Sequence, residues 1–84
     1  MVVRILSFIR IELGKTEEMY QKLQEIPQLK EIYAITGRYD LAIVLEAENG
    51  DIIHDIFAEK IDAMDGLIES NSHLIMKHKY LKGL

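Results

Sequence analysis

The fold of this chain is decided by residues 29–47, LKEIYAITGRYDLAIVLEA, at its centre. Residues 29–36 alternate and are rich in Ile and Tyr, and residues 41–47 are largely apolar, so each half is typical of a short β-strand. Residues 37–40, Gly-Arg-Tyr-Asp, have the composition of a turn between two such strands. The stretch therefore predicts an antiparallel hairpin.

The segment before this hairpin predicts a strand followed by a helix. Residues 2–13 are rich in β-branched and other apolar residues at both parities, which indicates a long strand with apolar groups on both faces. Thr16 is then well placed to cap a helix in which apolar residues recur every three or four positions. Pro27 ends that helix, because proline disfavours helical geometry in the residue before it.

The segment after the hairpin predicts a helix followed by a strand. Asn49 is placed to cap a second helix, Gly66 stops it, and residues 67 to about 80 return to extended character. The order strand, helix, strand, strand, helix, strand predicts an α+β fold of the ferredoxin-like βαββαβ type. Such a fold has a four-stranded antiparallel sheet with two helices on one face.

The other face of that sheet is also apolar. The first strand is apolar on both faces, with Val3, Ile5, Ile9 and Ile11 at one parity and Val2, Leu6 and Phe8 at the other, and so is part of the third strand through Ala42 and Val44. An apolar face that the helices do not cover must be buried against something else. We therefore expect a second copy packed sheet to sheet, a twofold homodimer of the dimeric α/β-barrel type.

The length of 84 residues allows one compact domain, residues 1–84, with a thin core. The chain has no cysteine, which excludes disulfides, thiolate metal sites and a cysteine nucleophile. Small domains are usually stabilised by disulfides, by a metal or by oligomerisation. The composition leaves oligomerisation as the leading expectation.

The charge and the amino terminus argue against nucleic-acid and membrane binding. The formal net charge is -4, whereas a protein that grips nucleic acid needs a basic surface to neutralise phosphates. The apolar residues 1–13 are interrupted by Arg4, Arg10 and Glu12, so they lack the uninterrupted core of a signal peptide or a membrane helix. We expect a cytoplasmic protein with no direct nucleic-acid contact and no membrane contact.

The histidines indicate no metal site. On a strand, His73 and His78 would face opposite sides. His54 lies beside Asp51 and Asp55, two acids that can orient an imidazole or simply share a solvated helix face. The sequence also has no phosphate-binding glycine loop and no G-x-S-x-G motif, so we expect neither a metal nor a cofactor.

Two polar clusters are candidates for ligand binding. Free backbone N–H groups beside Gly37 can bind a carboxylate, and the Asp40 carboxylate can hold an ammonium group, so together they match a free amino acid. A hairpin turn also needs glycine and aspartate for backbone reasons alone, which is the competing interpretation. Ser70 and Ser72 share one face at the start of the last strand and either line a small pocket or face solvent.

Two motifs resemble those of a known family, the effector-binding or RAM domain of the Lrp/AsnC feast/famine transcription regulators. Residues 26–31, IPQLKE, and 35–41, ITGRYDL, are similar to the family's I-P-x-V-x-E and x-T-G-x-Y-D-L. Residues 66–72, GLIESNS, are similar to its P-G-V-x-x-T-x-T, with serines in place of threonines and Asp65 in place of proline.

The resemblance implies a ferredoxin-like dimer that assembles into rings, commonly octamers, and binds amino acids between dimers. Carried over by position, the family's ligand groups fall on Gly37, Tyr39, Asp40, Ser70 and Ser72. The motif's variable position is occupied by Arg38, which we expect to tune specificity.

Family regulators carry a helix-turn-helix domain before the RAM portion, whereas the first strand here begins at Val2. The resemblance therefore implies a stand-alone, non-enzymatic sensor that modulates transcription by assembling with full-length relatives. One alternative is a small cofactor-free monooxygenase or isomerase of the dimeric α/β-barrel class, with His54 or Tyr33 buried against a closed cavity. Another is an architectural oligomer that binds no ligand.

Overall fold

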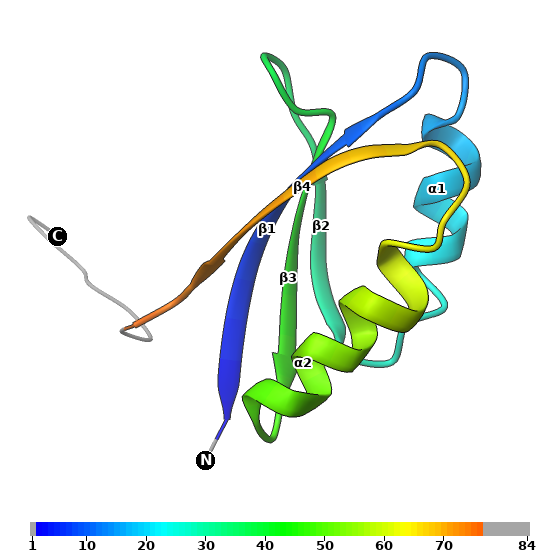
Figure 1. Ribbon diagram of the computed structural model, residues 1–84. Helices are drawn as coiled ribbons and strands as arrows, with labels where there is room; N and C mark the ends of the chain where they lie inside the picture. Colours follow the sequence, from blue (N-terminus) through cyan, green and yellow to red (C-terminus); the bar gives the residue numbers. More distant parts are fainter. Residues whose placement is uncertain (1, 77–84) are drawn as a thin grey trace, which may run out of the picture.

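The computed structural model describes residues 2–76, and within them it contains the predicted order of elements. These are β1 (Val3–Ile11), α1 (Thr16–Leu23), β2 (Leu29–Ala34), β3 (Leu41–Ala47), α2 (Gly50–Ile56), the π-helix η1 (Phe57–Ile61) and β4 (Leu67–Leu74). The strands form one antiparallel sheet in the order β2-β3-β1-β4. The ferredoxin-like fold is confirmed (Figure 1).

Side chains alternate across the sheet, and this alternation separates a face covered by helices from an open face. On β1 and β3, Ile9, Ile43 and Leu45 point toward the helices and are fully buried. They pack against buried side chains from every helical element, namely Met19, Leu23, Ile53, Ile56 and Ile61. Figure 1 shows α1 and α2 on the same side of the sheet, so the core of the chain lies in this single layer.

The start of α1 differs from the prediction that Thr16 caps it. Thr16 is the first helical residue, Lys15 is the N-cap, and no side chain caps this end. The reason is the preceding turn, in which the Lys15 N–H donates to the Glu12 carbonyl at 3.0 Å. That turn orients the Lys15 carbonyl to accept the first helical bond, from Met19 N–H at 3.0 Å, so the helix begins one residue early.

The second helix begins as predicted and then widens. The Asn49 side chain accepts a hydrogen bond from the Ile52 N–H at 3.0 Å, which confirms the cap. From Phe57 the helix becomes π-helical, with an Asp62 N–H to Phe57 carbonyl bond of 2.8 Å. A π turn adds one residue, so Ile61 instead of Lys60 faces the core. No helix within the described residues is long and apolar enough to cross a membrane.

The turn into β4 depends on Gly66. Its φ is +96°, and a Cβ placed on it would lie 2.7 Å from the Cβ of Lys15. Lys15 is held there by an ion pair of 2.8 Å with Asp65. The strand that follows ends at Leu74 instead of near residue 80, and residues 77–80 of the predicted strand lie outside the described residues.

The open face has an apolar centre with charged groups beside it. Its centre contains side chains from three strands, namely Leu6 and Phe8 of β1, Tyr33 of β2, and Ala42 and Val44 of β3. Arg4 lies beside this centre, paired with Glu46 at 3.1 Å and with Glu31 at 3.5 Å. Among residues 2–76 no helix covers this face.

Candidate functional site

The hairpin between β2 and β3 is clamped to the end of β1 by Asp40. The Asp40 N–H donates to the Ile9 carbonyl at 2.8 Å, and one carboxylate oxygen, Oδ2, accepts from the Ile11 N–H at 2.7 Å. The tip therefore stands at the end of the sheet where β1 ends (Figure 1). Asp40 has a structural role, and its second carboxylate oxygen has no donor among residues 2–76.

The tip of the hairpin requires a glycine and exposes backbone N–H groups. Gly37 has a φ of +104°, which other residues rarely adopt, and no protein atom lies within 4 Å of the position of an added Cβ. Within the described part of the chain, the N–H groups of Gly37, Arg38 and Tyr39 meet no protein acceptor. Consecutive unpaired N–H groups of this kind suit an anion such as a carboxylate.

Tyr39 fastens the hairpin to β4. Its hydroxyl donates to Glu69 Oε2 at 3.0 Å and accepts from the Asn71 side-chain amide at 3.1 Å. Its ring lies 5.7 Å from the ring of Phe8, centroid to centroid, on the open face. Tyr39 is thus held by groups from both β1 and β4.

Arg38 joins the same cluster from the tip of the hairpin. Its guanidinium lies 3.2 Å from Glu69 Oε1 and 5.7 Å from the centre of the Tyr39 ring. The hydrogen bond from Tyr39 and then that from Arg38 lower the pKa of Glu69 below its ordinary value. Glu69 is therefore ionised at neutral pH and neutralises Arg38.

Ser70 and Ser72 lie on the other side of β4 from this cluster. Ser70 is opposite Ile9, and Ser72 is opposite the buried Ser7, with 2.8 Å between the two hydroxyl oxygens. Both serines therefore point toward the helix side of the sheet. The structure brings together the hairpin residues of the predicted site and separates them from the two serines within this chain.

The β4 residues that meet the hairpin, Glu69 and Asn71, are not among the residues that the sequence predicts for the site. The alternation of a strand indicates that residues 69 and 71 face one side and residues 70 and 72 the other. It does not indicate which pair faces the hairpin, since that depends on the register of β4 against β1. The observed register pairs Asn71 with Phe8, an open-face residue.

A hollow beside the hairpin collects charged and apolar groups. It measures about 710 Å³ and is lined by Arg10, Ile11, Leu13, Gly37, Arg38, Asp40 and Ile68. Cationic groups, a carboxylate and exposed aliphatic side chains thus meet in one place. This combination matches the carboxylate, ammonium and side chain of an amino acid. We call it the hairpin hollow.

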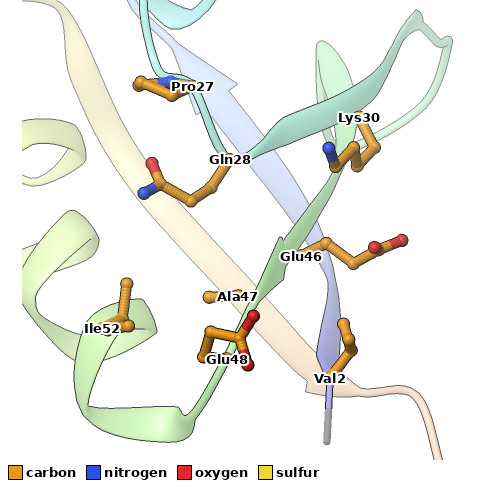
Figure 2. A pocket seen from close by; sticks show the side chains of 8 residues that line it. All are labelled: Val2, Pro27, Gln28, Lys30, Glu46, Ala47, Glu48 and Ile52. Carbon is orange, nitrogen blue, oxygen red and sulfur yellow. The ribbon is translucent and has the colours of Figure 1, made fainter.

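A second hollow lies at the opposite end of the sheet, where β1 begins and β3 ends. Figure 2 shows two of its polar side chains on different sides of β3: Gln28 reaches toward α2, whereas Glu46 points the other way. Glu46 is already paired with Arg4 at 3.1 Å. The carboxylates of Glu46 and Glu48 therefore belong to a charged strand end.

The histidines form no metal site within residues 2–76, where no group of three or more potential ligands occurs. His73 is exposed on β4 with its ring 5.9 Å from that of Phe8, and His54 is exposed on α2. His78 lies outside the described residues. Tyr33 is 52% exposed and donates a hydrogen bond to Glu31.

Comparison with known proteins gives matches over almost the whole chain. The HTH-type transcriptional regulator FL11 of Pyrococcus furiosus is 28% identical over 78 residues, 89% of this chain and 51% of that regulator. The structure of FFRP-DM1 superposes with a TM-score of 0.85 at 26% identity, covering 88% of this chain and 99% of that one. The chain spans about half the length of the curated relatives it matches.

More distant structures share the fold. A transcriptional regulator of Neisseria meningitidis, NMB0573, solved as a complex with L-Met, superposes with a TM-score of 0.85. It is 15% identical and covers 98% of this chain and 55% of that chain, so this likeness shows the fold alone. The family model of the Lrp/AsnC ligand binding domain matches residues 5–83. The chain belongs to the Lrp/AsnC ligand binding domain family.

Proposed function

We propose that this domain binds a free amino acid in the hairpin hollow and thereby regulates transcription. The observation that carries the proposal is the convergence of Gly37, Arg38 and Asp40 on one hollow with unpaired N–H groups at its edge. Two or three charge-assisted hydrogen bonds, less the cost of ordering the ligand, correspond to roughly millimolar to micromolar affinity. That range suits a sensor of nutrient supply.

The hairpin residues have distinct parts in this proposal. The backbone at Gly37 receives the carboxylate, Asp40 receives the ammonium group through its second oxygen, and Arg38 tunes specificity. Tyr39 holds the hairpin against β4. Ser70 and Ser72 face away from this chain's own hairpin, so we assign them to a site shared with a neighbouring subunit. The family resemblance implies a site between dimers, and residues of a neighbouring subunit can line such a site.

Membership of the family supports an amino acid as the effector. A regulator of the same fold from Neisseria meningitidis was solved as a complex with L-Met. The relatives of this chain are named as transcription regulators, which favours a regulatory role over an enzymatic one. The enzymatic alternative needs a buried His54 or Tyr33, and both are exposed in the described chain.

The open face supports a homodimer formed sheet to sheet. Its centre is apolar and contains Phe8 and Tyr33, aromatic residues of the kind enriched in interface cores. Beside that centre Arg4 forms ion pairs with Glu31 and Glu46, so part of the charge on this face is already paired within the chain. Further association of dimers into a ring such as an octamer completes the proposed assembly.

Transcription is regulated in this proposal through other proteins. The chain carries a net charge of -4, which disfavours direct binding to nucleic acid. Full-length Lrp/AsnC-type regulators are the partners that a shared domain fold favours, because equivalent open faces can pair. Such a role takes place in the cytoplasm.

Titration calorimetry with the twenty amino acids tests the ligand, using the wild-type domain, Asp40→Asn and Asp55→Asn. Asparagine keeps the bond that Asp40 accepts from Ile11 and removes the charge, so Asp40→Asn is expected to weaken binding at least about tenfold. Asp55→Asn removes an equal charge on α2 and should bind as wild type. Absence of heat and of thermal shift across the panel would refute amino-acid binding. Normal binding by Asp40→Asn would mean that the amino acid binds at another site.

Native mass spectrometry and a pull-down test the assembly. We expect dimers and higher rings from the chain alone, and mixed assemblies when a full-length Lrp/AsnC-type regulator is present. A monomer at micromolar concentration would contradict the open-face dimer. A ring that excludes the regulator would contradict co-assembly and leave the ligand proposal intact.

A further inference from the structure

Arg10 is a cation in the hairpin hollow that forms no direct ion pair among the described residues, although its charge contributes to the lowered pKa of Glu69. It lies on β1 directly opposite Glu69 in the register of the sheet. Glu69 is nevertheless held by Arg38 at 3.2 Å and by the Tyr39 hydroxyl at 3.0 Å. The guanidinium of Arg10 therefore remains available on a wall of the hollow that also contains Asp40.

The hollow is mainly polar, but two exposed aliphatic side chains, Leu13 and Ile68, also line it, and a β-bulge places Ile68 there. The register of β4 against β1 shifts between Arg10 and Ile11, which leaves Ile68 as the extra residue. Bulges re-aim side chains, and Ile68 is 53% exposed at the hollow. Leu13, fully exposed in the loop after β1, lines the same space.

Different residues of the hollow match the carboxylate, the ammonium group and the side chain of an amino acid. Arg10 is a planar donor suited to a bidentate carboxylate, and Asp40 has one carboxylate oxygen without a donor among residues 2–76. Leu13 and Ile68 offer aliphatic contact and no polar side-chain atom. The one remaining charged side chain of the hollow, Arg38, is already neutralised by Glu69.

We propose that Arg10 binds the α-carboxylate of the ligand, beside the N–H groups of the hairpin, and that Leu13 and Ile68 select an uncharged aliphatic or thioether side chain. The inference rests on the proposed function and names its ligand class. An acidic side chain finds no free cation here beyond Arg10, which the α-carboxylate occupies. A basic side chain likewise finds no free carboxylate among the lining residues, because the ammonium group of the ligand occupies Asp40.

The test compares L-leucine with two analogues that each lack one charged group. These are 3-methylbutylamine, without the carboxylate, and 4-methylpentanoate, without the ammonium group. Calorimetry is carried out on the wild-type domain, Arg10→Gln, Arg10→Lys and Lys60→Gln. Lys60→Gln removes one positive charge on η1, outside the hollow. Native mass spectrometry checks that all four proteins have the same assembly.

We expect L-leucine and L-methionine to bind more tightly than L-glutamate or L-lysine. Arg10→Gln should weaken L-leucine by about tenfold or more and leave 3-methylbutylamine unchanged, because only the carboxylate contact is removed. Arg10→Lys keeps the charge without the planar fork and should fall in between. Lys60→Gln should bind as wild type.

The outcomes distinguish this inference from the proposed function. If L-leucine binds and Arg10→Gln weakens L-leucine and the amine equally, Arg10 does not bind the carboxylate. If L-glutamate or L-lysine binds best, the ligand class is wrong while amino-acid sensing stands. If no amino acid binds to the wild-type domain, the proposed function itself fails.

Discussion

The two faces of the sheet are completed by different means. On the helix side, Ile9, Ile43 and Leu45 are fully buried by helices of the same chain. On the open side, Phe8 and Tyr33 are covered only in part or lie exposed in the single chain. The first face thus provides the stability of the subunit, and the second is available for other molecules.

The strand β4 shows the same contrast on a smaller scale. Ser72 faces the helix side and pairs with the buried Ser7 at 2.8 Å, a local contact between neighbouring strands. Glu69 and Asn71 face the open side and hold Tyr39, which is 30 and 32 positions away in the sequence, respectively. Polar residues on one side thus complete the packing, while those on the other position the hairpin of the proposed site.

The largest expected effect is on the helix side. Ile43→Ala removes a fully buried side chain at the centre of the sheet and should lower the free energy of unfolding by about 2–5 kcal/mol. Urea unfolding followed by far-ultraviolet circular dichroism measures the change. A loss below about 1 kcal/mol would mean that the core collapses around the missing atoms.

Phe8→Ala is the matched truncation on the open face. We expect it to weaken self-association about tenfold or more, because central aromatic residues dominate interface energies. Sedimentation across a concentration series reports the dissociation constant. Leu74→Ala removes an aliphatic side chain that is 56% exposed on the opposite face, and it should leave association unchanged. Equal effects of the two variants would argue against an open-face interface.

The next largest effect is the loss of stability when either of two glycines with similar backbone geometry is replaced by alanine. Gly66 has a φ of +96° and is crowded by Lys15, whereas Gly37 has a φ of +104° with nothing within 4 Å. Gly66→Ala should therefore cost about 1–3 kcal/mol in stability, and Gly37→Ala less, since only the backbone strain applies. Thermal unfolding of both variants measures the two losses of stability. A larger loss for Gly37→Ala would contradict the crowding at Gly66.

The smallest expected effect is a pH dependence at Glu69. Its pKa in the folded chain is lowered by the bonds from Tyr39 and Arg38. The unfolded state therefore binds more protons in the acidic range, and this contribution to stability is present above the ordinary carboxyl pKa and is lost as the pH falls through the folded pKa. Glu69→Gln should remove this part of the acid sensitivity.

Urea midpoints of the wild type and Glu69→Gln, measured from neutral to acidic pH, report this contribution as the difference between the two curves. Asp65 also has a lowered pKa, caused by Lys15, so Asp65→Asn serves as a control for a carboxylate remote from the hairpin. The hairpin resonances of Tyr39 should shift with pH in Asp65→Asn and not in Glu69→Gln. Parallel pH curves for the wild type and Glu69→Gln would mean that these bonds contribute nothing to stability.

Much of the fold is predictable from local pattern. The run at residues 41–47 predicts a strand with the observed bounds, and Asn49 predicts its cap, since both depend on neighbouring residues. Thr16 fails as a cap because a turn made by Glu12 and Lys15 starts the helix earlier. The π turn at Phe57 is likewise not predicted, because it arises where Ile61 must reach the core.

The sequence by itself determined the order of the strands and helices, the glycine at the hairpin tip and the presence of apolar groups on both faces of the sheet. These follow from backbone sterics and from the periods of helix and strand, which act over a few residues. Only the tertiary structure decided that Glu69 and Asn71, instead of Ser70 and Ser72, meet the hairpin, and that Arg10 joins Asp40 in its hollow. Those contacts depend on the register and the bulge between β1 and β4, which are set by packing between distant segments.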